Sequence, residues 1–388
     1  MKDNIVKVLA VADPAVYVYV NEEYGILDRI MGKSGVKVEF DIVPWERYYD
    51  TLMDSLNGKI DYDIVMVAGH LWLKDFVEKN YLSELKENDD RDYDYMDISE
   101  VIRDEMTIDG IRYLYPSFCD GHIIVYRKSV VEAAYGVIDK RAITTDEYIE
   151  IARAVHGYDN MSAVAMKSHE SEIFLDLIPF IRNEGIEPID INSHLPKLDS
   201  PECLRGLNKY INLKKYSISG TENLGNDGVK EAFQNKKVVM TTTWGGQLGM
   251  VMDENCLERG DIGFLTFNTS WNVTWSFGIT AKSKKKDMAE KLLIYLTSKE
   301  VDRYVGSFAG SPVRKSTYEN DSNEYPWYET HYDLIANYAK PMPKMLNTGS
   351  IIGPIYTAVY SAFTGRSEPS EALRKAQSNI MDFINGGV

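Results

Sequence analysis

Cysteine is scarce in this chain. The 388 residues include only Cys119, Cys203 and Cys256, and no two of them have CxxC spacing. An odd number of widely separated cysteines gives neither a disulfide framework nor the ligand spacing of a zinc site. We therefore expect three buried thiols and no metal centre.

Long apolar runs are also missing. No stretch approaches the roughly 20 residues that a membrane-spanning helix needs. The sequence begins Met1-Lys2-Asp3-Asn4 and enters a β-type run, Ile5 to Ala12, without the apolar core of a signal peptide. Two expectations follow: either the protein is cytoplasmic, or a signal segment has been removed.

Basic residues are in deficit. There are 43 lysines and arginines against 59 acidic residues, which gives a net charge of −16. The one basic cluster, Lys282 to Lys286, does not offset this charge. Because such a field repels phosphate groups, nucleic acid and anionic membranes are excluded as partners.

The common catalytic signatures are absent as well. The sequence has no HExxH, P-loop or GxSxG motif, and no GxGxxG between a strand and a helix. The usual hydrolase and nucleotide-binding classes lose their support, and we expect no cofactor.

Four weaker patterns are better explained as ordinary loops and turns than as functional sites. Thr243 to Gln247 follows a strand and offers amides to an anion, but it has no lysine partner. Asp90, Asp92 and Asp94 alternate as in a calcium loop, yet Tyr95 stands where the sharp turn needs glycine, which favours a solvated acidic loop. His169 and Glu170 lack the helical pairing of metal ligands, and the SxxK string Ser283 to Lys286 fits a charged turn.

Carboxylates leave an enzymatic alternative open. Asp13, Asp120 and Glu170 each follow an expected strand, and a glycosidase uses a pair of carboxyl groups whose distance the sequence does not show. The same groups serve binding equally well, because a carboxylate accepts hydrogen bonds from neighbouring hydroxyls.

Tryptophan is the most informative residue that the chain does contain. Five of its six tryptophans stand next to expected strands. In open α/β sheets ligands bind outside the carboxyl ends of the strands, and indole offers a flat apolar face there. The alternative is that these rings fill the core near loop bases. The five residues are Trp45, Trp72, Trp244, Trp271 and Trp275.

The length and the apolar periodicity indicate two α/β domains. A chain of 388 residues exceeds one ordinary core. Strand and helix patterns alternate, which favours mostly parallel sheets covered on both faces. No linker divides the chain cleanly, so we expect several crossings between the domains. The expected strands are 5–12, 36–43, 63–68, 122–126, 163–166, 238–242, 262–267 and 277–281, and the expected helices are 22–33, 45–57, one that begins at 144–147, 172–183, 201–215, 229–235, 287–297 and a helical block over 325–384.

The order of several short motifs resembles a known family, the extracellular solute-binding proteins of ABC importers, in its carbohydrate-binding family 1 branch, which is maltose-binding-protein-like. The resemblance runs almost end to end. It rests on Pro44 to Tyr48, Tyr62 to Val65, Tyr81 to Leu85, Tyr113 to Pro116, Tyr126 to Lys128, Thr145 to Tyr148, Phe277 to Ile279, Tyr295 to Ser298, Gly310 to Arg314, Pro341 to Pro343 and Gly365 to Ala376.

The resemblance implies an α/β fold of two lobes, the type II periplasmic-binding-protein-like fold, with a hinge between them. Lobe 1 would comprise residues 1–117 and 270–313, and lobe 2 would comprise residues 118–269 and 314–388. The ligand would lie in an aromatic-lined cleft between the lobes. The ligand-binding residues it implies are Asp13, Tyr17, His70, Trp72, Asp120, His169, Glu170, Trp244, Trp271, Trp275 and Arg314.

In this set, Arg314 fits a hinge or packing residue as readily as a ligand contact. Trp45 lies outside the set and is expected to be a structural residue at the start of a helix. Aromatic residues are unusually dense around Asp13 to Tyr19, which leaves the identity of the solute open.

The implied function is capture of a mono- or oligosaccharide and its delivery to the transmembrane subunits of an ABC permease, without catalysis. We expect a monomer outside the cytoplasm, tethered as a lipoprotein, whose signal segment is absent from this sequence. The alternatives are a binding protein for another small solute, such as a polyamine or a peptide, a ligand-binding subunit of a sensor, and a glycosidase.

Overall fold

The chain forms two compact units. The computed structural model describes residues 4–86 and 92–386, so Asp90 of the acidic loop lies outside the described residues. Unit 1 comprises residues 1–120 and 273–328, and unit 2 comprises residues 121–272 and 329–388. The chain thus passes between the units after residues 120, 272 and 328, compared with the predicted boundaries after residues 117, 269 and 313.

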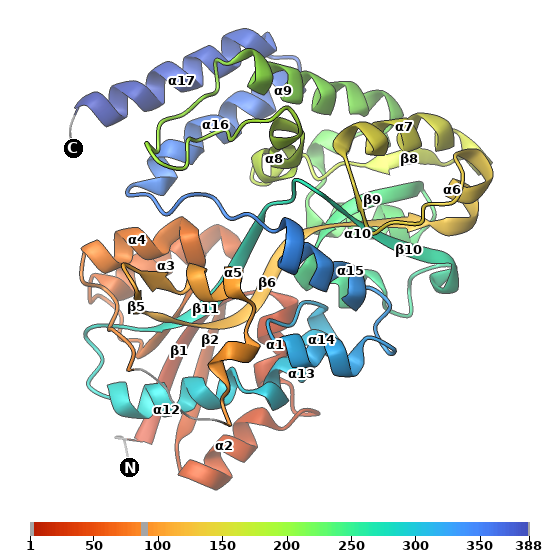
Figure 1. Cartoon of the computed structure of the whole chain (residues 1–388). Helices are drawn as coiled ribbons and strands as arrows, with labels where there is room; N and C mark the ends of the chain where they lie inside the picture. The colour runs from red at the N-terminus through yellow and green to blue at the C-terminus, as the bar shows by residue number, and fades with distance from the viewer. Residues whose placement is uncertain (1–3, 87–91, 387–388) are drawn as a thin grey trace. The chain divides into compact units, whose positions relative to one another are not determined.

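Unit 1 is a mixed sheet covered by helices (Figure 1). Its strand order is β2-β1-β3-β11-β6, in which β1 runs parallel to β2 and β3, and β11 runs antiparallel to β3. Its elements are β1 Ile5–Val11, α1 Pro14–Val20, α2 Ile26–Ser34, β2 Lys37–Val43, α3 Trp45–Leu56, β3 Ile64–Ala68, α4 Gly69–Glu78, α5 Glu100–Glu105, β4 Thr107–Ile108, β5 Ile111–Arg112, the first half of β6 Leu114–Arg127, β11 Asn272–Ile279, α12 Lys286–Leu296, α13 Lys299–Ala309 and α14 Lys315–Asp321.

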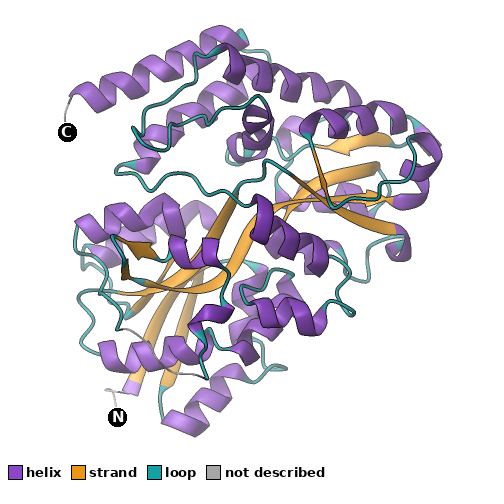
Figure 2. Cartoon of the chain, in the orientation of Figure 1, coloured by secondary structure: helices purple, strands orange, loops and turns teal. Residues whose placement is uncertain are grey.

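Unit 2 has a second mixed sheet, again flanked by helices (Figure 2). The second half of β6 lies between β9 and β10 and is antiparallel to both, while β8 is parallel to β9 and β7 is parallel to β10. Its other elements are α6 Lys128–Ala134, β7 Ala142–Ile143, α7 Thr145–Val155, β8 Ser162–Ala165, α8 Ile173–Asn183, α9 Pro201–Leu213, α10 Asn226–Gln234, β9 Val238–Trp244, α11 Leu248–Val251, β10 Ile262–Phe267, α15 Tyr328–Asp333, a π-helical turn Leu334–Tyr338, α16 Thr348–Phe363 and α17 Pro369–Gly386.

Local sequence signals explain several element starts. Thr144 and Glu147 form the capping box that begins α7. Ser200 caps α9 and Pro201 occupies its first turn, where a missing N–H costs nothing. In α3 the predicted apolar spacing is confirmed, since Tyr48 and Leu52 are fully buried.

Other expectations need correction. No helix was predicted over residues 69–78, but Trp72 lies there in helix α4, and Trp275 lies within β11 rather than ahead of it. The run His122 to Tyr126 is part of β6, a fully buried strand of 14 residues that continues through Cys119 and Asp120. All three cysteines are buried and free, as expected.

Two kinds of feature are absent from the described residues. None of their helices combines the length and apolarity that a bilayer span requires. Across residues 4–86 and 92–386, no group of three or more histidine, cysteine or acidic side chains gathers as a metal-binding cluster.

Gly206 makes the contact between helices α8 and α9 possible. A Cβ atom at this position would lie 2.8 Å from Ile181 Cα and 2.9 Å from Phe180 O. We expect Gly206→Ala to lower the free energy of unfolding by about 3 kcal/mol, because the clash is with backbone that has no room to move. Urea denaturation measures this change.

Gly353 in α16 is the matched control, since nothing lies within 4 Å of an added Cβ there. Gly353→Ala should raise the free energy of unfolding by about 0.5 to 1 kcal/mol through helix propensity alone. Equal effects of the two substitutions would show that the α8–α9 contact does not depend on glycine.

Candidate functional site

The carboxyl edge of the unit 1 sheet gathers polar and aromatic side chains. Because β2, β1 and β3 are parallel, their last residues share one edge. Asp13 follows β1, Trp45 follows β2, and Trp72 follows β3. The antiparallel strand β11 pairs Trp275 with Ala68, the last residue of β3, so this residue belongs to the same edge.

Three of these side chains form what we call the unit 1 aromatic cluster, Trp45, Trp72 and Trp275. The rings of Trp45 and Trp72 are nearly parallel, with centroids 6.1 Å apart, and Trp275 meets them edge-on at 5.9 and 5.7 Å. Tyr48 lies 6.3 Å from both Trp72 and Trp275. Since aromatic rings favour these offset and T-shaped geometries, the cluster is a stable apolar platform.

A buried carboxylate holds two members of this cluster in place. Glu105, at the end of α5, accepts hydrogen bonds from the Thr274 amide at 3.0 Å and the Thr274 hydroxyl at 2.8 Å. The His70 imidazole lies 3.0 Å from the same carboxylate. His70 stands two residues before Trp72 and Thr274 directly before Trp275, so Glu105 ties α4 to β11. The approach requires Gly69, where a Cβ would lie 2.8 Å from Glu105 Oε2.

Two carboxyl groups also belong to this part of unit 1. Asp13 caps α1 by accepting the Ala15 amide at 2.9 Å. Burial and the charge of Asp120 together raise the pKa of Asp13 well above its ordinary value, although the Ala15 amide opposes the shift. Asp120 is itself buried at the last unit 1 position of β6. A carboxyl group accepts hydrogen bonds when it is ionised and can also donate one when it is protonated.

The corresponding edge of the unit 2 sheet carries Trp244 and Lys167. Trp244 is the last residue of β9, and Lys167 follows the parallel strand β8 by two residues. In the antiparallel pairing of β6 with β9, His122 stands opposite Trp244. The His122 and Trp271 rings lie 4.8 and 5.4 Å from that of Trp244.

Trp244 is held mainly by charged side chains. The Lys167 ammonium lies 3.1 Å from the centre of the indole ring, as a cation–π contact. The indole N–H donates to Glu172 Oε2 at 3.2 Å. As a result Trp244 is only 7% exposed, and much of its ring surface already contacts protein.

The charges around Trp244 compensate one another. Burial raises the pKa of Glu172 and that of Asp176, and the positive charge of Lys167 opposes both shifts. Asp176 also accepts hydrogen bonds from the Tyr210 hydroxyl at 2.9 Å and the Thr242 hydroxyl at 2.8 Å. Burial lowers the pKa of His122 well below its ordinary value, and Lys167 acts in the same direction. His122 is therefore neutral at pH 7, and it lies beside a lysine whose charge offsets those of Glu172 and Asp176.

The sequence-derived ligand residues lie in varied surroundings. Tyr17 on α1 is 47% exposed, whereas His70 is buried against Glu105. His169 and Glu170 lie in an exposed turn after β8, and Trp271 is buried. Their contacts with a ligand remain predictions. Unit 1 contains Asp13, Tyr17, His70, Trp72, Asp120, Trp275 and Arg314, and unit 2 contains His169, Glu170, Trp244 and Trp271.

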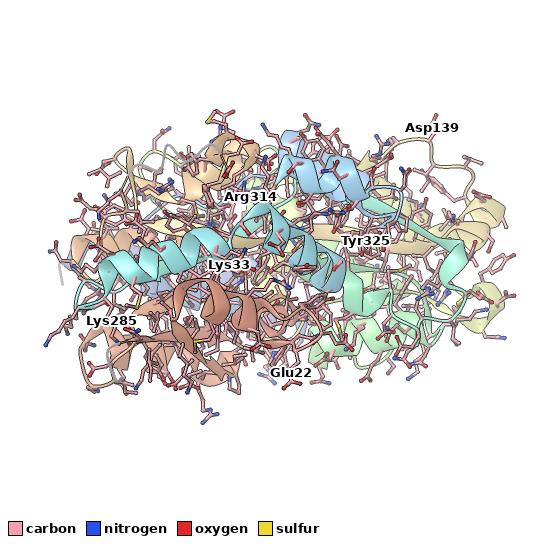
Figure 3. The ribbon with its side chains drawn as sticks, turned by 90° about the horizontal axis from the view of Figure 1, so that it is seen from below. Glu22, Lys33, Asp139, Lys285, Arg314 and Tyr325 are labelled. Carbon is pink, nitrogen blue, oxygen red and sulfur yellow. The ribbon has the colours of Figure 1, made fainter. Side chains whose placement is uncertain are left out.

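Arg314 serves packing within unit 1. Its side chain is fully buried at the start of α14 (Figure 3). The guanidinium donates to the carbonyl oxygens of Tyr93 at 2.8 Å, Asp94 at 3.1 Å and Thr297 at 2.8 Å. The sequence left Arg314 open as a ligand contact or as a hinge or packing residue, and these bonds favour packing.

Sequence reasoning missed four side chains that define these edges. Glu105, Glu172 and Asp176 act from inside helices or at their ends, and no motif marks them. Lys167 gave a usable signal, since it follows a predicted strand directly in the way that the tryptophans do.

Two α/β units, each with tryptophan at the carboxyl edge of its sheet, define the class of bilobal solute-binding proteins. The family model for the bacterial extracellular solute-binding proteins matches residues 26–330. The chain belongs to this family.

Solved structures share the fold over nearly the whole chain. A maltose-bound MalE3 from T. maritima superposes with a TM-score of 0.85 at 20% identity, covering 98% of this chain and 99% of that one. An ABC transporter solute-binding protein of Agrobacterium vitis with bound D-mannitol gives 0.83 at 21% identity, covering 99% of both chains. One from Thermotoga lettingae with bound α-D-tagatose gives 0.83 at 21%, covering 97% and 99%. These likenesses confirm the predicted two-lobed periplasmic-binding-protein-like fold.

Proposed function

We propose that this protein captures a carbohydrate outside the cytoplasm and delivers it to an ABC permease. The observation that carries the proposal is the placement of indole rings beside carboxyl groups at the carboxyl edge of each sheet. Sugars present apolar C–H faces to indole and hydroxyl groups to carboxyls, so such edges suit them. The solved relatives with bound maltose, mannitol and tagatose support the same class of ligand.

The charges favour a neutral, hydroxyl-rich ligand over a cationic one. In unit 1, Asp13 and Asp120 would attract a cation as readily as a sugar. In unit 2, however, the Lys167 ammonium already contacts the Trp244 ring, so this indole face is not open for a cation–π contact with a polyamine. A neutral sugar suits the groups at either edge.

We further propose that binding is the whole activity. The glycosidase alternative would use Asp120 with Glu170, but Glu170 lies in an exposed turn, whereas a glycosidase's catalytic acid lies in a pocket that shields it from water. Incubation of the protein with oligosaccharides should release no new reducing ends. New reducing ends that disappear in Asp120→Asn would instead establish the enzyme.

The partners and location follow from the same proposal. The carbohydrate would pass to the transmembrane subunits of an importer, and the protein would act as a monomer tethered outside the cytoplasm as a lipoprotein. An extracytoplasmic place agrees with the family to which the chain belongs.

A thermal-shift panel tests the proposal. It would contain mono- and oligosaccharides, alditols, polyamines, peptides and metal ions. A carbohydrate present at about 100 times its dissociation constant adds roughly 2.7 kcal/mol to the free energy of unfolding, which is readily seen as a higher melting temperature. Stabilisation by a polyamine or peptide, with none by any carbohydrate or alditol, would overturn the proposal.

A further inference from the structure

Trp45 is the accessible tryptophan of this protein. All six tryptophans lie among the described residues, and Trp45 is 46% exposed. Trp244, Trp271, Trp275 and Trp327 are each less than a tenth exposed, and Trp72 is half-buried. The sequence had assigned Trp45 to the scaffold of a helix start, yet its ring is the least enclosed of the six.

The cluster holds the exposed ring in a fixed orientation. The near-parallel Trp72 lies 6.1 Å from Trp45 with an interplanar angle of 12°, and Trp275 meets Trp45 edge-on. The Glu105 carboxylate in turn ties α4, which carries Trp72, to β11, which carries Trp275, through His70 and Thr274. A ring that is backed by other rings loses little freedom when a ligand stacks on it, so such a surface is preorganised for binding.

The chemistry of the neighbouring strand complements this ring. Trp45 follows β2 and Asp13 follows β1, and these adjacent strands end in register, with Val11 opposite Val43. Adjacent strands are about 4.8 Å apart, so the ends of β1 and β2, after which Asp13 and Trp45 follow, lie within the span of one or two sugar rings. This surface is continuous with the carboxyl edge already described.

We propose that Trp45 is the platform on which a ring of the ligand stacks, and that the ligand is therefore a cyclic sugar rather than an acyclic alditol. This rests on the proposed function. A pyranose has a flat face of C–H groups that matches indole, whereas an alditol of the same composition is flexible and presents no such face. The solved relatives include proteins with each kind of ligand bound, so the fold does not decide between a cyclic sugar and an alditol. Trp45 favours the cyclic sugar.

The experiment compares each cyclic sugar with the alditol obtained by reducing it. Calorimetry with D-mannose and D-mannitol, D-glucose and D-sorbitol, and maltose and maltitol is run on the wild type, Trp45→Ala and Trp45→Phe. We expect Trp45→Ala to weaken binding of the cyclic sugar about tenfold or more, as removal of a stacking aromatic does. We expect Trp45→Phe to restore most of the affinity, and the alditols to bind more weakly and to respond little.

Tyr135→Ala is the control, because Tyr135 is 40% exposed and lies in α6's C-terminal cap in unit 2, away from either edge. This variant should bind as the wild type does.

In the wild type, iodide should quench mainly Trp45 fluorescence, and a bound cyclic sugar should protect it. That readout needs no substitution, so it decides the matter even if Trp45→Ala does not fold.

The outcomes separate this inference from the function on which it rests. Binding of neither sugars nor alditols contradicts the proposed function. Alditols that bind as tightly as their parent sugars, or sugar binding that Trp45→Ala and iodide protection leave unchanged, overturns the inference alone. Unchanged sugar affinity with lost delivery to a reconstituted permease would instead assign Trp45 to a protein-docking surface.

Discussion

Replacing Arg314 by methionine should lower the free energy of unfolding by about 3 to 5 kcal/mol, the usual cost of removing one partner from a buried charged network. The guanidinium is fully buried and satisfies the carbonyl oxygens of Tyr93, Asp94 and Thr297, which belong to separate segments of unit 1. Its charge also opposes the burial that raises the pKa of Asp302 to about 6. Methionine would leave these buried groups without their donor.

Arg303→Met is the matched control. Arg303 lies in the same unit and pairs with Asp321 at 2.6 Å, but its side chain is 56% exposed. Arg303 is in contact with water although Asp321 is only 8% exposed, so this variant should lose clearly less folding free energy than Arg314→Met. Urea denaturation gives both values. Equal midpoints for Arg314→Met and the wild type would contradict the assignment of Arg314 to packing.

Replacing Lys167 by methionine should also cost about 3 to 5 kcal/mol of folding free energy. The fully buried ammonium lies against the Trp244 ring, and its charge opposes the upward pKa shifts of Glu172 and Asp176. Without it two buried carboxyls face no compensating cation. Lys214→Met is the control, since Lys214 likewise pairs with an acid, Glu222, and lies over an aromatic ring, Phe363, but is 37% exposed.

The Lys167→Met deficit should depend on pH. Burial already raises the pKa values of Glu172 and Asp176, and loss of Lys167 raises them further. A carboxyl whose pKa is higher in the folded state contributes stability below its unfolded pKa of about 4, and this contribution is lost as pH rises through the folded pKa. The difference between variant and wild type should therefore be smaller at pH 5 than at pH 8. A deficit that is constant over this range would show that Lys167 does not compensate these carboxyls.

Helix α1 shows where local sequence was ambiguous. The run Pro14–Val20 is rich in valine and tyrosine, which favour strands, and no helix was predicted there. Asp13 as N-cap and Pro14 in the first turn were the signals for a helix. Packing decides for the helix over the strand, since the helix buries four side chains, Ala15, Val16, Val18 and Tyr19.

The candidate site, too, could be predicted from the sequence only in part. The positions of the strands along the chain are readable from periodicity, and the tryptophans next to them pointed to the ends of strands as the place of the site. Which indole remains accessible depends on neighbours distant in sequence, such as Lys167 on Trp244 or Glu105, which binds His70 and Thr274 near Trp72 and Trp275. For that reason the sequence assigned Trp45 to the scaffold and did not single out Lys167, and the contact proposed for the buried Trp271 stays a prediction.

Titration calorimetry of the ligand-free protein against a carbohydrate panel tests the central claim most directly. We predict saturable binding of at least one cyclic sugar, with one ligand per chain, an unchanged ligand after incubation, and affinity reduced about tenfold or more by Trp45→Ala. Binding of a polyamine, peptide or metal ion with no heat from any carbohydrate would contradict the account.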